Sequence, residues 1–177
     1  MTAQTDAVIA GIERLELDFL AYLPSSSIAP IIEHFRGRSG RAGSPVAFPI
    51  SREEEGVGIV GGMALAGRRA AMLVQDNGFG NSLTALTTFA VAYNVSLLVL
   101  ANTRGGLGEY NSMIHSFSGG VPAMLDAARI PVFLVDRRNS SDDWTGTIVE
   151  AYRHAEMTHR PVALLMDFWA PKAEPAP

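Results

Sequence analysis

Three consecutive carboxylates, Glu53, Glu54 and Glu55, follow Ser51 at the start of a segment rich in small residues. Ser51 and Glu54 have the spacing of a capping box, which predicts that a helix begins at Ser51. On a helical period of 3.6 residues, only Glu53 shares a face with the apolar residues that follow. A carboxylate that points toward a core needs a partner or a chemical task. Glu53 is therefore a candidate catalytic residue, the alternative being three solvated charges at the positive end of the helix dipole.

A glycine-rich stretch, Gln75-Asp76-Asn77-Gly78-Phe79-Gly80-Asn81, lies between an apolar strand and the next helix. Its glycines permit a close approach of the backbone to a ligand. The alternative is a plain strand-to-helix turn in which Asn81 caps the helix.

Further side chains could bind a small anion or move a proton. The guanidinium of Arg104 is a planar fork of donors that suits a sulfonate, phosphonate or carboxylate, unless it only braces its loop through a salt bridge with Glu109. His115 could hydrogen-bond a carboxylate or relay a proton, although a lone loop histidine is more often surface decoration. Ser25 and Ser26 either contact a ligand or cap the helix that follows them.

One pattern is misleading. Residues 56–61 match G-x-G-x-x-G, but a dinucleotide fingerprint must lie at the turn between a strand and a helix. A helix start at Ser51 places these glycines inside the helix. We expect them to allow close packing against the sheet or against a partner subunit, the alternative being a close approach to a cofactor ring.

The chain alternates helix and strand and shows no internal repeat. We predict an α/β fold, a three-layer, doubly wound, six-stranded, mostly parallel sheet. Strands are expected at residues 18–23, 46–50, 70–74, 96–101, 132–135 and 162–166. Helices are expected at residues 4–17, from 25–27 to 36, from 51, and at 80–93, 121–129 and 142–159. Residues 102–118 should form a long polar loop, which in a compact domain is usually functional.

Ligands in such sheets bind beyond the carboxyl ends of the strands. The segments 24–27, 51–55, 75–81 and 102–118 all fall at that edge. Their convergence predicts one site there, whatever its chemistry.

Composition sets broad limits. The 177 residues suit one domain, residues 1–170, with a disordered tail at 171–177. The net charge of −4 argues against nucleic acid or an anionic membrane as a partner. Cysteine is absent, so neither disulfides nor thiolate metal sites can form. The N-terminus does not have the pattern of a signal peptide, and no apolar run is long enough for a membrane helix, so we expect a cytoplasmic location.

Together these segments resemble the pyrimidine-binding (PYR) domain of thiamine diphosphate enzymes. The narrower similarity is to the separate α subunit of sulfopyruvate decarboxylase and to its relative phosphonopyruvate decarboxylase. Those proteins carry a glutamate nine residues before a helix glycine, a Q-N-S-G-L-G-N loop and an R-G-x-x-G-E-x-N segment. Glu53 lies nine residues before Gly62, and the other two motifs match residues 75–81 and 104–111. Asp76 and Asn77 depart from the family's Asn-Ser, which puts the exact substrate in doubt, because a carboxylate beside an anionic substrate would be unusual.

The resemblance implies a glutamate that hydrogen-bonds the N1′ nitrogen of the cofactor's aminopyrimidine ring, and that glutamate is Glu53. It also implies an active-site histidine, His115. The implied cofactor-binding residues are Glu53, Gln75, Asn77, Gly78, Phe79, Gly80 and Asn81, and the implied substrate-binding residues are Ser25, Ser26, Arg104 and Asn111.

The family holds Mg²⁺ and the diphosphate on a second domain through a G-D-G motif, which does not occur in these 177 residues. The resemblance therefore implies a separate β subunit that carries the metal, no metal ligands in this chain, and a small anionic 2-oxo acid as substrate. Alone, the chain is expected to bind cofactor weakly with Glu53 facing water, and to form homo-oligomers through its glycine-rich helix. The alternatives are a phosphonopyruvate or other 2-oxo acid decarboxylase subunit, a catalytically silent interaction or regulatory subunit, and an unrelated flavodoxin-like ligand-binding domain.

Overall fold

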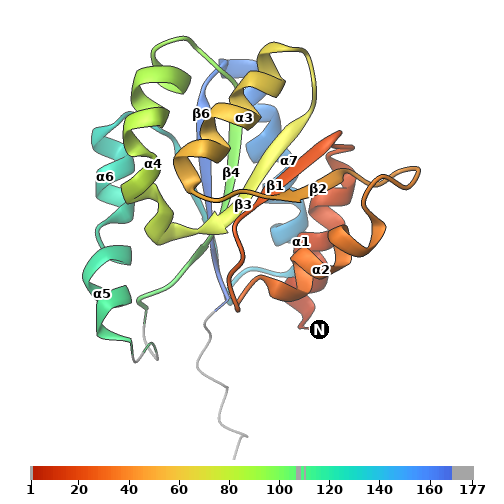
Figure 1. The fold of residues 1–177 in the computed structure, drawn as a ribbon. Helices are drawn as coiled ribbons and strands as arrows, with labels where there is room; N and C mark the ends of the chain where they lie inside the picture. The colour runs from red at the N-terminus through yellow and green to blue at the C-terminus, as the bar shows by residue number, and fades with distance from the viewer. Residues whose placement is uncertain (1, 107–108, 110, 169–177) are drawn as a thin grey trace, which may run out of the picture.

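A parallel sheet forms the centre of the molecule in the computed structural model, which describes residues 2–106, 109 and 111–168 (Figure 1). In the described residues its six strands have the order β2-β1-β3-β4-β6-β5, and every neighbouring pair is parallel. The strands are β1 (Phe19–Tyr22), β2 (Val46–Pro49), β3 (Ala70–Gln75), β4 (Leu97–Thr103), β5 (Val132–Val135) and β6 (Pro161–Asp167). The predicted doubly wound α/β fold is confirmed.

Helices cover both faces of the sheet (Figure 1). They are α1 (Ala3–Arg14), α2 (Ala29–Arg38), α3 (Glu53–Leu65), α4 (Phe79–Ala85), α5 (Ser112–Ser118), α6 (Val121–Ala127) and α7 (Ser141–Thr158). Successive side chains of a strand point to opposite faces, which creates two cores. One core joins the sheet to α1, α2 and α7, and the other joins it to α3, α6 and the segment after α4.

The order of the strands reverses at the middle of the sheet. From β1 the chain runs outward through α2 to β2, then returns through α3 across β1 to β3. The connections leaving β1 and β3 therefore run in opposite directions, and a crevice between their carboxyl ends is where such folds bind ligands.

The start of α3 differs from the prediction. The helix begins at Glu53 with Arg52 at the N-cap position and without a side-chain cap. The backbone N–H of Ser51 donates to Glu55 Oε2 at 2.7 Å, whereas Glu54 pairs with Arg52 at 2.7 Å. The predicted capping box between Ser51 and Glu54 is therefore wrong, because Arg52 draws the Glu54 carboxylate away.

Other boundaries also move. The predicted loop at 102–118 is shorter, because β4 continues to Thr103 and α5 occupies residues 112–118. The helix predicted at 80–93 is α4 followed by a π-helical segment (Leu86–Val91), and a 3₁₀ turn (Asp76–Gly78) precedes it. α1 ends at Arg14, and α2 begins only at Ala29. The tail predicted at 171–177 lies outside the described residues.

Among the described residues, none of the helices combines the length and the apolar character needed to cross a membrane.

Candidate active site at the carboxyl edge of the sheet

Glu53 is the first residue of α3, and only 6% of its surface is exposed. The side-chain amide of Asn81 donates to Glu53 Oε2 at 3.1 Å. A Cβ at position 78 would lie 2.3 Å from Glu53 Cγ and 2.5 Å from its Oε1, so the carboxylate occupies space that only Gly78 leaves open. Glu53 points inward as predicted. The expectation that it faces water in the single chain is wrong, because residues of the same chain cover it.

The glycines of α3 separate into two sets. A Cβ at Gly56 would lie 2.8 Å from Met72 Cε on β3, and one at Gly61 would lie 2.5 Å from a ring carbon of Phe89. These two positions hold the helix close to its neighbours, which confirms the packing interpretation of the G-x-G-x-x-G pattern. Gly58 and Gly62 are exposed and have no neighbour within 4 Å of such a Cβ among the described residues.

Ser25 and Gln75 meet across the point where the strand order reverses. The Ser25 hydroxyl donates to Gln75 Oε1 at 3.1 Å, which joins the segment after β1 to the end of β3. The predicted capping role of Ser25 is wrong, because α2 has Ile28 at its N-cap position and no side-chain cap. Ser25 and the exposed Ser26 line a surface pocket of about 520 Å³ that also includes Arg36.

Asp76 is fully buried and does not border the surface. Its Oδ2 accepts hydrogen bonds from Thr103 Oγ1 at 2.7 Å and from the Arg104 backbone N–H at 3.2 Å. Its Oδ1 accepts from Ser118 Oγ at 2.9 Å. The expected conflict between this carboxylate and an anionic substrate is therefore not present, since Asp76 is used inside the fold. Sequence reasoning missed this role, and only the family's different residue at the position marked it as unusual.

Arg104 forms an ion pair with Glu109, whose side chain is fully buried. Arg104 Nε and Nη2 both lie within 2.8 Å of Glu109 Oε2, and Glu109 Oε1 accepts from the Asn111 N–H at 2.9 Å. His115 Nε2 pairs with the carbonyl oxygen of Glu109. The loop-bracing salt bridge weighed from the sequence is present, and a role for Arg104 as a substrate anchor stays a prediction.

The predicted site residues thus fall into two groups. The first group consists of Glu53, Gly78 and Asn81. The second group, called the Arg104–His115 group below, consists of Arg104, Asn111 and His115. Asp76 lies between the two groups. Asn111 Oδ1 is engaged as the cap of α5, accepting from the Met113 N–H at 3.1 Å.

The remaining predicted cofactor-binding residues differ in exposure. Asn77 and Gly80 are exposed beside the first group. The side chain of Phe79 is not brought to this surface, because it is 1% exposed and belongs to the core beneath α3.

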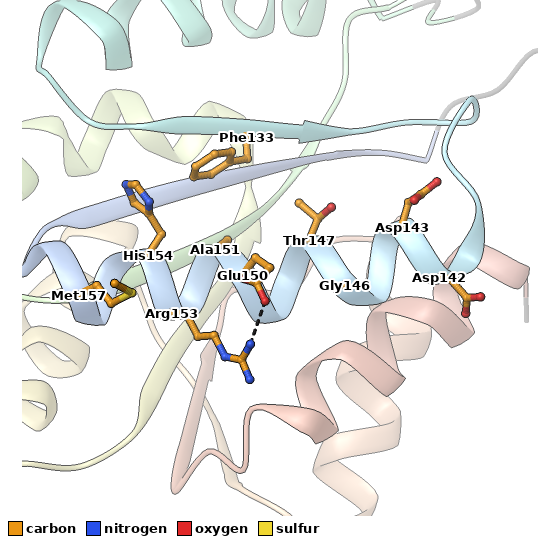
Figure 2. Close-up of a pocket in the computed structure, with 10 residues that line it drawn as sticks. All are labelled: Phe133, Asp142, Asp143, Gly146, Thr147, Glu150, Ala151, Arg153, His154 and Met157. Carbon is orange, nitrogen blue, oxygen red and sulfur yellow. Dashed lines mark hydrogen bonds and ion pairs between the residues drawn. The ribbon is translucent and has the colours of Figure 1, made fainter.

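A pocket of about 710 Å³ lies elsewhere, between α7 and the edge strand β5 (Figure 2). It shares no residue with the predicted site. Glu150 and Arg153 pair along its rim at 2.9 Å, and Phe133 forms part of its apolar wall. Within the described ranges, no group of three or more His, Asp or Glu residues is arranged to hold a metal ion.

No family model matches the chain. A search of curated proteins finds "Sulfopyruvate decarboxylase subunit alpha" of Methanococcus maripaludis, 27% identical over 167 residues that cover 93% of this chain and 96% of that protein.

Two solved structures share the fold at lower identity. The structure of 2-oxoglutarate:ferredoxin oxidoreductase from Magnetococcus marinus matches with a TM-score of 0.70, 19% identity and 94% of this chain covered. Benzoylformate decarboxylase from Polynucleobacter necessarius matches with a TM-score of 0.65, 17% identity and 100% covered. This chain spans 29% and 33% of those longer chains. The predicted resemblance is confirmed, and the chain is a homologue of sulfopyruvate decarboxylase α subunits over nearly its whole length.

Proposed function

We propose that the chain is the PYR-domain α subunit of a two-chain, thiamine diphosphate-dependent 2-oxo acid decarboxylase. The first candidate reaction is the conversion of sulfopyruvate to sulfoacetaldehyde and CO₂. The observation that carries the proposal is Glu53, a buried carboxylate that Gly78 and Asn81 hold at the carboxyl edge of the sheet. The similarity to sulfopyruvate decarboxylase α subunits supports it.

The residues present fit a bound pyrimidine ring. Glu53 Oε2 is already held by Asn81, whereas Oε1 has no hydrogen-bond partner among the described residues. Such an oxygen can accept from, or share a proton with, a ring nitrogen. Asn77 and Gly80 are exposed beside this carboxylate. These residues, with Gln75, would hold the pyrimidine half of thiamine diphosphate.

When bound, thiamine diphosphate supplies the electron sink that permits loss of CO₂ from a 2-oxo acid. The chain's own contribution is to position the Glu53 carboxylate and to protect it from water. Glu53 would hold the hydrogen bond to the ring nitrogen N1′, and its burial would limit the access of water to that hydrogen bond. Asn81 fixes the orientation of that carboxylate.

The second group of residues would bind the substrate. Arg104, whose guanidinium is paired with Glu109, would also contact the substrate's acidic groups. His115 lies one helical turn beyond Asn111, where it could relay a proton. Ser25 and Ser26 complete the polar lining on the side of β1. The proposed substrate class, a small 2-oxo acid with a second anionic group, is supported by the similarity to sulfopyruvate decarboxylase α subunits.

A partner subunit is part of the proposal, because two relatives that match more than nine tenths of this chain are named α subunits. The partner would hold Mg²⁺ and the diphosphate and would close the pyrimidine site from the other side. Shared sites of this kind make each chain inactive by itself.

The test is reconstitution. The chain is purified with and without the β subunit, and CO₂ release is measured with sulfopyruvate, phosphonopyruvate and simple 2-oxo acids. We expect turnover that requires thiamine diphosphate, Mg²⁺ and both chains, fastest with sulfopyruvate. Turnover by the single chain would contradict the two-chain assignment. A stable complex that decarboxylates none of these acids would identify a catalytically silent subunit instead.

A further inference from the structure

Asp76 connects the two groups of the candidate site. It follows Gln75 directly and is the first residue of the turn that packs Gly78 against Glu53. Its carboxylate accepts from Arg104 at the start of the segment 104–118 and from Ser118 at its end. A single buried side chain therefore holds both ends of that segment.

The described residues between these ends contact one another. Gly105 has φ +83°, a conformation that favours glycine, and a Cβ there would lie 3.1 Å from Ser118 Cβ. The ion pair between Arg104 and Glu109 and the contact of His115 with the Glu109 carbonyl close it further. These contacts connect the described residues of the segment to one another, and Asp76 connects them to the turn that bears Gly78.

We propose that Asp76 is a positioning residue that fixes the place of the Arg104–His115 group relative to Glu53. This inference depends on the proposed function in one respect only, the identity of the ligands that the two groups bind. Its physical basis is that hydrogen bonds to a buried carboxylate are stronger than neutral ones, and that removing the acceptor leaves buried donors without a partner. Without Asp76 the segment should open while the sheet stays intact.

Trypsin measures this opening directly, because Arg104 is the only Lys or Arg in residues 104–118 and its side chain is 16% exposed. We expect Asp76→Ala to raise the rate of cleavage after Arg104 by about tenfold or more, the change expected when local opening loses the free energy of a buried hydrogen bond. In Asp76→Asn, trypsin should cleave after Arg104 at nearly the native rate. Its amide oxygen can replace Oδ2, and its amide nitrogen can donate to Ser118 Oγ.

Asp143→Ala is the matched control. It also removes a carboxylate that accepts a backbone N–H, from Ser140 at 2.8 Å at the start of α7, but far from the segment in the chain. It should leave cleavage after Arg104 unchanged. Equal cleavage of Asp76→Ala and Asp143→Ala would overturn the proposal. If Asp76→Ala does not fold, Ser118→Ala takes its place, and a native cleavage rate in that variant would contradict the proposal equally.

In the reconstituted enzyme, Asp76→Ala should raise KM by about tenfold with a smaller change in kcat, and Asp76→Asn should restore the native KM. An unchanged KM alongside rapid cleavage would show that the segment does not face substrate, which overturns the positioning role. Cleavage rates do not depend on decarboxylation, so failure of the proposed function and failure of this inference are distinguishable.

Discussion

At the scale of single residues, the candidate site depends on one close contact. Glu53 packs where a side chain at position 78 would otherwise lie. Gly78→Ala should therefore push the flexible glutamate out of its position rather than unfold the sheet. We expect a folded chain with a lower melting temperature and, in the reconstituted enzyme, at least about a hundredfold loss of kcat, the scale of a misplaced catalytic group. Native kcat in a folded Gly78→Ala variant would show that the position of Glu53 is not critical.

Arg104 has two possible roles, to anchor the substrate or only to brace its loop. Substitution of its partner Glu109 distinguishes between them. Arg104→Ala leaves the buried Glu109 carboxylate without its guanidinium, a loss on the order of 3–5 kcal/mol when a buried pair is broken. The double variant Arg104→Ala/Glu109→Ala removes that penalty. If Arg104 anchors substrate, KM stays about tenfold or more above native in the double variant, as expected for a lost charge-assisted contact. Steady-state kinetics that return to the native KM would make Arg104 a loop brace only.

These residues also show what the sequence could predict. The inward direction of Glu53 followed from helical periodicity, because its neighbours three and four positions later are apolar. The role of Asp76 did not, because its partner Ser118 is 42 residues away and the contact depends on tertiary packing. The hydrogen bond from Ser25 to Gln75, which lies 50 residues away, was not predicted for the same reason.

At the scale of elements, α3 presents an open face at Gly58 and Gly62 near the exposed Leu65. Gly62→Ala should raise the stability of the single chain by about 0.5–1 kcal/mol, since glycine is unfavourable inside a helix. If a partner subunit packs closely on this face, the same methyl group weakens assembly. We expect both effects, measured by thermal unfolding of the single chain and by the Kd for the partner.

Gly146→Ala provides the control. Gly146 lies inside α7 and also has no neighbour within 4 Å of an added Cβ among the described residues. It should stabilise the chain by a similar amount and leave the Kd unchanged. An unchanged Kd in Gly62→Ala would place the partner elsewhere.

The sequence patterns predicted the long helices and strands but not the short ones. The all-apolar run of β4 predicted a buried parallel strand, and the structure buries Leu97–Asn102. α5 has seven residues, too few for a helical period to stand out, and was expected to be loop. The π-helical turn after α4 has no sequence signature that separates it from an α-helix.

At the scale of the whole molecule, the parallel arrangement accounts for the site. Because all strands run the same way, the segments after β1, β2, β3 and β4 emerge at one edge. Hydrogen bonds then connect them, from Ser25 to Gln75, from Asn81 to Glu53, and from Thr103 and Ser118 to Asp76. This convergence was predicted from the alternation of elements alone. The connections between the segments were not, because they depend on the register of the strands.

The central claim is that Glu53, and neither neighbouring carboxylate, drives the chemistry of a shared site. The most direct measurement is CO₂ release by the reconstituted two-chain enzyme carrying Glu53→Gln, compared with Glu54→Gln, which changes the carboxylate whose Oε1 pairs with the exposed Arg52. We predict that Glu53→Gln assembles normally and loses at least about a thousandfold in kcat, within the range expected for general acid–base catalysis. Glu54→Gln should keep nearly native turnover. Near-native turnover in Glu53→Gln, with loss in Glu54→Gln, would contradict the account.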